Sequence, residues 1–128
     1  MEIGILAYGA YIPRRRLARK SVADANAWFN PALKAQARAE RSMCNWDEDA
    51  VTMAVEAARD CLSGLDREPV RAVQLASTSF PFEDRLNSGI VAQALNLDPE
   101  ISSLDVGSSQ RAATAGLLGW IVPGLGHI

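Results

Sequence analysis

The chain has 128 residues, 48% of them hydrophobic and 22% charged, which suits one small globular domain with a packed core. A formal net charge of −2 gives no general electrostatic reason to expect nucleic acid or a membrane surface as a partner, and no segment is long and apolar enough to span a bilayer. Two cysteines and one histidine are too few for a disulfide framework or a protein metal site, so the composition predicts a cytoplasmic protein with reduced thiols.

The first part of the chain predicts a strand, a helix and a basic segment. Residues 3–11 form a short apolar segment, which favours a buried strand that ends before Pro13. Ser21 is a candidate cap for a helix that stops at Asn30, before a proline. Residues 33–41 are helix-prone and basic, and form either a second short helix or an ordered loop. The inward face of the capped helix would carry Val22, Ala25, Trp28 and Phe29.

The clearest helix of the sequence opens at Asp47. Three acidic residues, Asp47 to Asp49, lie at its first turn, where the helix dipole favours negative charge, and Gly64 is a natural residue to end it. Small side chains at helical spacing predict close packing against a sheet or another helix. This apolar stripe consists of Ala50, Met53, Ala54, Ala57, Ala58, Cys61 and Leu62.

The rest of the chain alternates strands with helices. Residues 70–76 and 101–106 predict the second and third strands, and a loop over 77–82 separates the second strand from a helix over 87–95. A last helix begins at about Gln110. The inward face of the helix over 87–95 would carry Ile90, Val91, Ala94 and Leu95.

The order of these elements, βαβαβα, favours parallel strands joined by right-handed crossovers, so we expect an α/β layered fold with a mostly parallel sheet. Such a sheet needs both faces covered, and three strands with one unfinished helix leave the fold incomplete. Residues 1–120 are the expected domain portion. Residues 121–128 are an atypical C-terminal tail, because Pro123 cannot continue a helix and two glycines follow it.

The stretch from Asp105 to Leu117 is the most informative of the chain. It predicts a buried strand, a tight turn at Gly107–Ser109 and a helix that opens with small residues. Many enzymes present a nucleophile on such a turn, beside backbone N–H groups and the helix dipole. The side chain best placed for display is Gln110, whose amide is no nucleophile. Ser109 and Arg111 flank it and are candidate substrate-binding residues.

Four segments carry a resemblance to a known family. They are Gly4–Pro13, Asp47–Ala54 with Glu56–Ala58, Val73–Ser79 and Asp105–Leu117. Together they resemble the thiolase superfamily, closest to hydroxymethylglutaryl-CoA synthase and the third type of β-ketoacyl-carrier-protein synthase. The similarity covers residues 3–118. Complete members of the family are much longer, so the resemblance implies a fragment from the first half of the family fold.

By this resemblance, Gln110 stands where the family has its nucleophilic cysteine, and Ser79, after Thr78, stands at the general-base glutamate of the hydroxymethylglutaryl-CoA synthases. The family's histidine comes from the absent second half, and His127 does not match it. The resemblance implies an acyltransferase for Claisen-type condensation of acyl-CoA or acyl-carrier thioesters, with no bound cofactor. Because glutamine cannot take an acyl group as a thioester, we expect this chain to be inactive alone.

Further interpretations stay open. In related ketosynthases a glutamine at this place marks decarboxylating domains, which suggests decarboxylation of a malonyl-type thioester. A non-catalytic member, in which Gln110 only caps its helix, would be a scaffold or binding subunit, and a small α/β domain with an unrelated task is also possible. The partners expected from the resemblance are acyl-CoA or an acyl carrier protein, together with a second copy in a homodimer or an intact synthase subunit.

The remaining candidates have structural alternatives. Ser109 lacks a histidine in range and a Gly-x-Ser-x-Gly pattern, so a turn or cap role is favoured over a nucleophile. Cys61 lies on the apolar stripe and belongs in the core, whereas Cys44 is a structural or a reactive exposed thiol. The run Arg14–Arg16 either meets coenzyme A phosphates or an acidic carrier, or forms a solvated rim.

The aromatic residues also allow two interpretations. Trp28, Phe29 and Trp46 either line an acyl or pantetheine channel or close a core. By the resemblance, Phe80 and Phe82 lie near a dimer interface. The alternative for these two is a cap on the helix that follows them.

Overall fold

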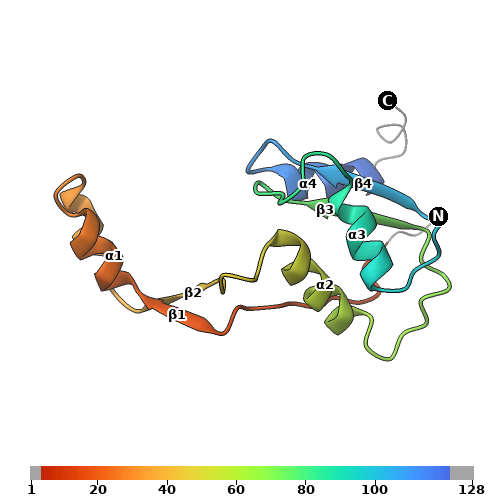
Figure 1. Ribbon diagram of the computed structural model, residues 1–128, viewed down its shortest axis with the longest axis horizontal. Helices are drawn as coiled ribbons and strands as arrows, with labels where there is room; N and C mark the ends of the chain where they lie inside the picture. Colours follow the sequence, from red (N-terminus) through yellow and green to blue (C-terminus); the bar gives the residue numbers. More distant parts are fainter. Residues whose placement is uncertain (1–3, 122–128) are drawn as a thin grey trace. The chain divides into compact units, whose positions relative to one another are not determined.

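The computed structural model describes residues 4–121, in which the chain divides into two compact units (Figure 1). One unit is Ile12–Glu48, and the other joins the N-terminal residues up to Tyr11 to the residues from Asp49 onwards. No helix in the described range is long and apolar enough to cross a membrane. Residues 122–128 of the predicted tail lie outside the described residues, as does Ile3 of the first predicted strand.

The smaller unit is built on a two-stranded antiparallel sheet that the sequence did not predict. Leu17 lies opposite Arg41 in this pair. Most residues of both strands are exposed, so the strands lack the apolar alternation that marks a half-buried strand. The elements of the unit are β1 (Arg15–Ala18), α1 (Arg19–Asn26), the 3₁₀ helix η1 (Pro31–Gln36) and β2 (Glu40–Met43).

Two predictions for the smaller unit are wrong. The helix α1 begins before Ser21 and follows Ala18, so Ser21 does not cap it. Trp28 and Phe29 lie beyond its end with 84% and 76% of their surface exposed, and Ala23 is the buried residue of the helix. Sequence spacing gives the face that aromatic residues share, but only a sufficiently large neighbouring layer buries them.

The larger unit contains the parallel sheet that the sequence predicted. Its strands pair in parallel from Ala72 opposite Ser102 to Ala76 opposite Val106, and a helix crosses between them (Figure 1). The α/β fold class is therefore confirmed. The elements of the unit are α2 (Ala50–Cys61), β3 (Ala72–Ala76), α3 (Asn87–Ala94), β4 (Ser102–Val106) and α4 (Ala112–Ile121).

Helices cover the two faces of this sheet unequally. Val73 and Leu75 of β3 pack against the core between α2 and α3, whereas Gln74 between them lies against Gly116 of α4. Because successive strand residues point to opposite faces, α2 and α3 lie on one side of β3 and α4 lies on the other. The buried cluster between α2 and α3 consists of Val51, Val55, Val91 and Leu95, and the predicted inward residue Ala94 is exposed.

The predicted first strand is wrong in its described part. Residues 4–13 belong to neither described sheet, and the side chains of Ile5, Leu6 and Tyr8 are exposed. The segment lies along α2 instead, where Ala10 N donates to Asp60 Oδ2 at 3.0 Å. A strand forms only where a neighbour takes its backbone hydrogen bonds, and apolar sequence does not reveal whether that neighbour exists.

The cap of α2 yields a first prediction. Asp49 accepts a hydrogen bond from Thr52 N, and Thr52 Oγ1 accepts one from Asp49 N, both at 2.8 Å. We expect Asp49→Ala to lower the free energy of unfolding by about 1 kcal/mol, because the helix loses its N-cap acceptor. Asp47→Ala is the matched control, since Asp47 is exposed and outside the cap. Equal losses in urea unfolding of the two variants would contradict the prediction.

Candidate functional site

The turn between β4 and α4 displays Gln110. Ser108 has a φ of +65°, in the left-handed region that non-glycine residues rarely adopt. Ser109 Oγ accepts from Arg111 N at 3.1 Å, and Ser109 O accepts from Ala112 N at 3.0 Å, so Ser109 organises the start of the helix. Gln110 and Arg111 are both exposed. The turn therefore holds its backbone in a fixed conformation and leaves the side chain of Gln110 open to solvent.

The loop after β3 leaves the same edge of the sheet. Ser77 N donates to Val106 O at 3.1 Å, which ties the start of this loop to the end of β4. Ser79 is exposed, and its N–H donates to Ser77 Oγ at 3.1 Å. An open pocket of about 720 Å³ is lined by both loops and includes Ser79 and Ser108, but Gln110 is not among its lining residues.

Asp105 connects this edge of the sheet to α3. Its carboxylate accepts from Asn87 N and from Ser88 N, both at 2.7 Å, at the first turn of the helix. Burial raises the pKa of Asp105, but the hydrogen bonds from Asn87 and Ser88 outweigh it and hold the pKa below its ordinary value. A carboxylate at a helix N-terminus is stabilised by unpaired N–H groups and the helix dipole.

Sequence reasoning missed the role of Asp105. An acidic residue near the end of a buried strand, followed by a turn, was the available signal. The start of a helix at Asn87-Ser88 was a second signal. Nothing in the spacing of the sequence indicates that this helix start meets Asp105. The start of α3 and Asp105 come together because α3 connects two neighbouring parallel strands, β3 and β4.

The other candidate residues of the sequence belong to other segments of the chain. Cys61 is half-buried on α2. The smaller unit exposes Cys44, Trp46 and the run Arg14–Arg16. The interpretation that Trp46 closes a core is therefore wrong.

In the loop after β3, the guanidinium of Arg85 lies 5.2 Å from the ring centre of Phe82, a cation–π contact.

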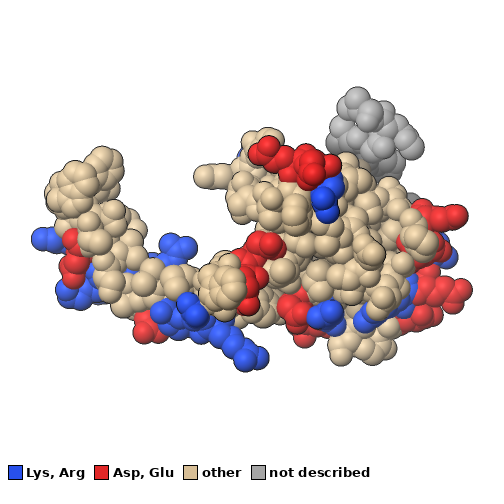
Figure 2. Space-filling view, viewed as in Figure 1, with Lys and Arg blue, Asp and Glu red and all other residues tan. Residues whose placement is uncertain are grey.

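Basic residues gather on the smaller unit, as Figure 2 shows. Residues 12–48 contain eight Lys or Arg and four Asp or Glu, although the whole chain has a net charge of −2. Most of these side chains are exposed. The unit therefore presents positive charge to solvent, which suits an anionic partner but does not identify one.

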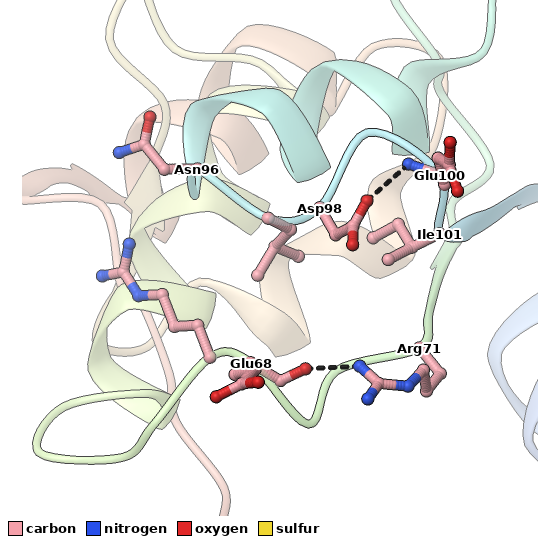
Figure 3. Close-up of a pocket in the computed structure, with 8 residues that line it drawn as sticks. Glu68, Arg71, Asn96, Asp98, Glu100 and Ile101 are labelled. Atoms are coloured by element: carbon pink, nitrogen blue, oxygen red, sulfur yellow. Dashed lines mark hydrogen bonds between the residues drawn. The ribbon is translucent and has the colours of Figure 1, made fainter.

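A second pocket, of about 430 Å³, lies at the opposite, amino end of the β3–β4 sheet (Figure 3). Charged side chains in it are bonded to protein groups, and Arg67 donates to Leu95 O at 2.5 Å. The guanidinium of Arg71 donates to Glu68 O, and Asp98 Oδ1 accepts from Glu100 N at 2.9 Å. None of the predicted site residues lines this pocket. Across residues 4–121, no group of three or more acidic, histidine or cysteine side chains is arranged to hold a metal ion.

Comparisons with known proteins show what this chain is similar to. No family model matches the chain. The hydroxymethylglutaryl-CoA synthase of Methanosarcina mazei is 39% identical over 122 residues, covering 90% of this chain and 34% of the relative. That of Methanococcus vannielii is 36% identical over 121 residues, covering 91% of this chain and 34% of the relative. Over the matched segment the chain is hydroxymethylglutaryl-CoA synthase-like.

Solved structures agree on the fold of this thiolase-like chain. An OleA variant from Xanthomonas campestris superimposes with a TM-score of 0.73 at 17% identity, over 87% of this chain and 35% of that one. The priming β-ketosynthase of the R1128 polyketide pathway superimposes with a TM-score of 0.72 at 22% identity, over 88% of this chain and 34% of that one. The thiolase-like chain spans about a third of the length of the curated relatives it matches.

Proposed function

We propose that this chain is the N-terminal segment of an acyltransferase of the hydroxymethylglutaryl-CoA synthase type. The reaction of the complete enzyme is Claisen-type condensation of thioesters, with acyl-CoA or an acyl-carrier thioester as substrate and no bound cofactor. The observation that carries the proposal is an exposed residue on the turn between β4 and α4 of a thiolase-like fold. The identity of 39% to a hydroxymethylglutaryl-CoA synthase over the same segment supports it.

The residues at this turn limit what the chain does. Condensation needs a thiolate that takes the acyl group, and a base that makes a carbanion. Gln110 supplies no thiolate, and the hydroxyl of Ser79 is too weak a base for the second step. In this proposal Ser109 and Arg111 contact the thioester substrate beside Gln110. The 128-residue chain therefore neither transfers acetyl groups nor condenses thioesters by itself.

The glutamine favours a second candidate function. Its side chain has the size and polarity of a short acylated cysteine, so the site can hold a thioester without a covalent bond. A complete protein with this glutamine would then decarboxylate a malonyl thioester, or would bind as a scaffold to an intact synthase subunit. Release of carbon dioxide from malonyl-CoA supports decarboxylation, whereas co-purification of an intact synthase without turnover supports the scaffold. A homodimer is the expected arrangement of the complete protein.

The test is to supply the missing thiol. We expect Gln110→Cys to form a covalent acetyl adduct from acetyl-CoA about ten-fold faster than Cys44, because a helix N-terminus lowers the pKa of a thiol and favours the thiolate. Mass spectrometry of peptides from the intact chain measures both rates. Cys44 is exposed and provides an internal control from a thiol of the smaller unit.

A chimera extends the test to turnover. Residues 1–118 would be joined to the remaining part of the Methanosarcina mazei synthase, with either Gln110 or Gln110→Cys. Condensation by the cysteine form alone supports the acyltransferase proposal. If neither form binds or converts a thioester, the assignment of chemistry is wrong even though the fold is that of the family.

A further inference from the structure

Asn87 is the first residue of α3, and its side chain is fully bonded although only 1% of the residue is exposed. Its Oδ1 accepts from Phe82 N at 3.2 Å, and its Nδ2 donates to Phe82 O at 2.9 Å. The same Nδ2 donates to Asp105 Oδ2 at 2.8 Å. One amide thus binds both backbone groups of a single loop residue and a carboxylate on β4, which only one orientation of the amide satisfies.

These bonds connect the two loops that flank the 720 Å³ pocket. Phe82 belongs to the loop after β3, three residues beyond Ser79, and Asp105 lies two residues before Gly107, where the turn to Gln110 begins. A second contact joins the same loops, because a Cβ on Gly107 would lie 3.0 Å from Cε2 of the Phe80 ring. The loop after β3 is therefore joined to the end of β4 through a partly buried polar contact, and to Gly107 of the turn through an aromatic ring.

We propose that Asn87, which is buried, and Asp105, which is partly buried, form a polar lock that sets the spacing between the loop bearing Ser79 and the turn bearing Gln110. They are positioning residues, and neither is placed in contact with substrate. A buried amide whose oxygen and nitrogen are both hydrogen-bonded favours one arrangement of the backbone around it, because any other leaves polar groups unpaired. The chemical consequence rests on the proposed function, since positions 79 and 110 matter to catalysis only if thioesters bind there.

The lock is tested by a distance measurement that needs no substrate. Nitroxide labels at Ser79→Cys and Gln110→Cys, in a Cys44→Ser and Cys61→Ser background, report the spacing of the two exposed positions by electron paramagnetic resonance. We expect Asn87→Ala to widen the distance distribution about two-fold, because the loop loses its fixed orientation. The control is Val91→Ala, which removes core packing from the same helix and leaves the distribution unchanged. Equal widths for the two variants would overturn the proposal.

A second measurement uses the unmodified chain and so does not depend on a variant that folds. If the lock holds, the amide of Phe82 exchanges with deuterium about a hundred-fold more slowly than that of exposed Asp84 in the same loop. Equal exchange rates for Phe82 and Asp84 would also overturn the proposal.

The link to chemistry is measured separately. In the Gln110→Cys chain at saturating acetyl-CoA, we expect Asn87→Ala to slow acylation about ten-fold, and Val91→Ala to leave it unchanged, because misplacement of a reacting group costs rate. If Gln110→Cys is not acylated at all, the proposed function fails, and the distance and exchange measurements still decide on the lock.

Discussion

Gly9→Ala is expected to destabilise the larger unit by about 2–3 kcal/mol, because the added methyl group overlaps the backbone of α2. A Cβ at this position would lie 2.2 Å from Cys61 N and 2.5 Å from Ala57 O. Backbone atoms of a helix cannot move aside without breaking its hydrogen bonds, so the N-terminal segment must separate from α2. The hydrogen bond from Ala10 N to Asp60 then also lengthens or is lost.

Urea unfolding monitored by circular dichroism measures the effect of Gly9→Ala. Gly4→Ala is the matched control, since it lies in the same segment and its Cβ would meet no atom within 4 Å. We also expect a protease to cleave the segment of residues 4–11 faster in Gly9→Ala than in Gly4→Ala. If the two variants unfold at the same urea concentration, the segment does not pack against α2 as described.

Asp105→Asn is expected to cost about 3 kcal/mol at neutral pH, because hydrogen bonds to a charged group are lost at the start of α3. The neutral amide presents N–H groups toward donors that need an acceptor, chiefly Asn87 N and Ser88 N. Asp84→Asn is the control, because Asp84 is exposed and makes a surface ion pair with Arg85 at 3.5 Å.

The difference between Asp105 and Asp105→Asn is expected to depend on pH. The folded pKa of Asp105 lies below its ordinary value of 3.8, so the carboxylate contributes stability that is fully present above this value. That contribution is lost as the pH falls through the folded pKa, where the native carboxyl is protonated as well. Unfolding measured from pH 7 down to pH 3 should therefore show the gap closing below about pH 4. A gap of constant size would show that charge is not the cause.

Local sequence patterns were sufficient for the elements that carry their own boundary signals. The acidic residues before Ala50 and the small-residue stripe predicted α2, although its cap is Asp49 and its first acidic residues precede the helix. The two strands of the parallel sheet were found within one or two residues, because short apolar runs between turns are typical of buried strands. The turn at Gly107–Ser109 also followed from its own residues, but the helix after it begins at Ala112, whereas the sequence predicted a start at about Gln110.

Local sequence patterns gave wrong predictions wherever secondary structure or burial depended on contact with another segment of the chain. Residues 4–11 have the apolarity of a strand but run along a helix, and Trp28 is exposed despite lying on a predicted inward face. The hairpin of β1 and β2 gave no signal, because its residues are mostly exposed and charged. In each case the missing information was which other segment lies alongside.

The sequence by itself determined the α/β class, the parallel strands, the family resemblance and the presence of a glutamine at the turn, because each follows from residues close together in the chain. Only the tertiary structure decided that Asp105 meets the start of α3 and that Asn87 holds the loop of Ser79. Hydrogen bonds between residues eighteen positions apart depend on how the crossover places the strands, and that geometry is set by packing of the whole unit.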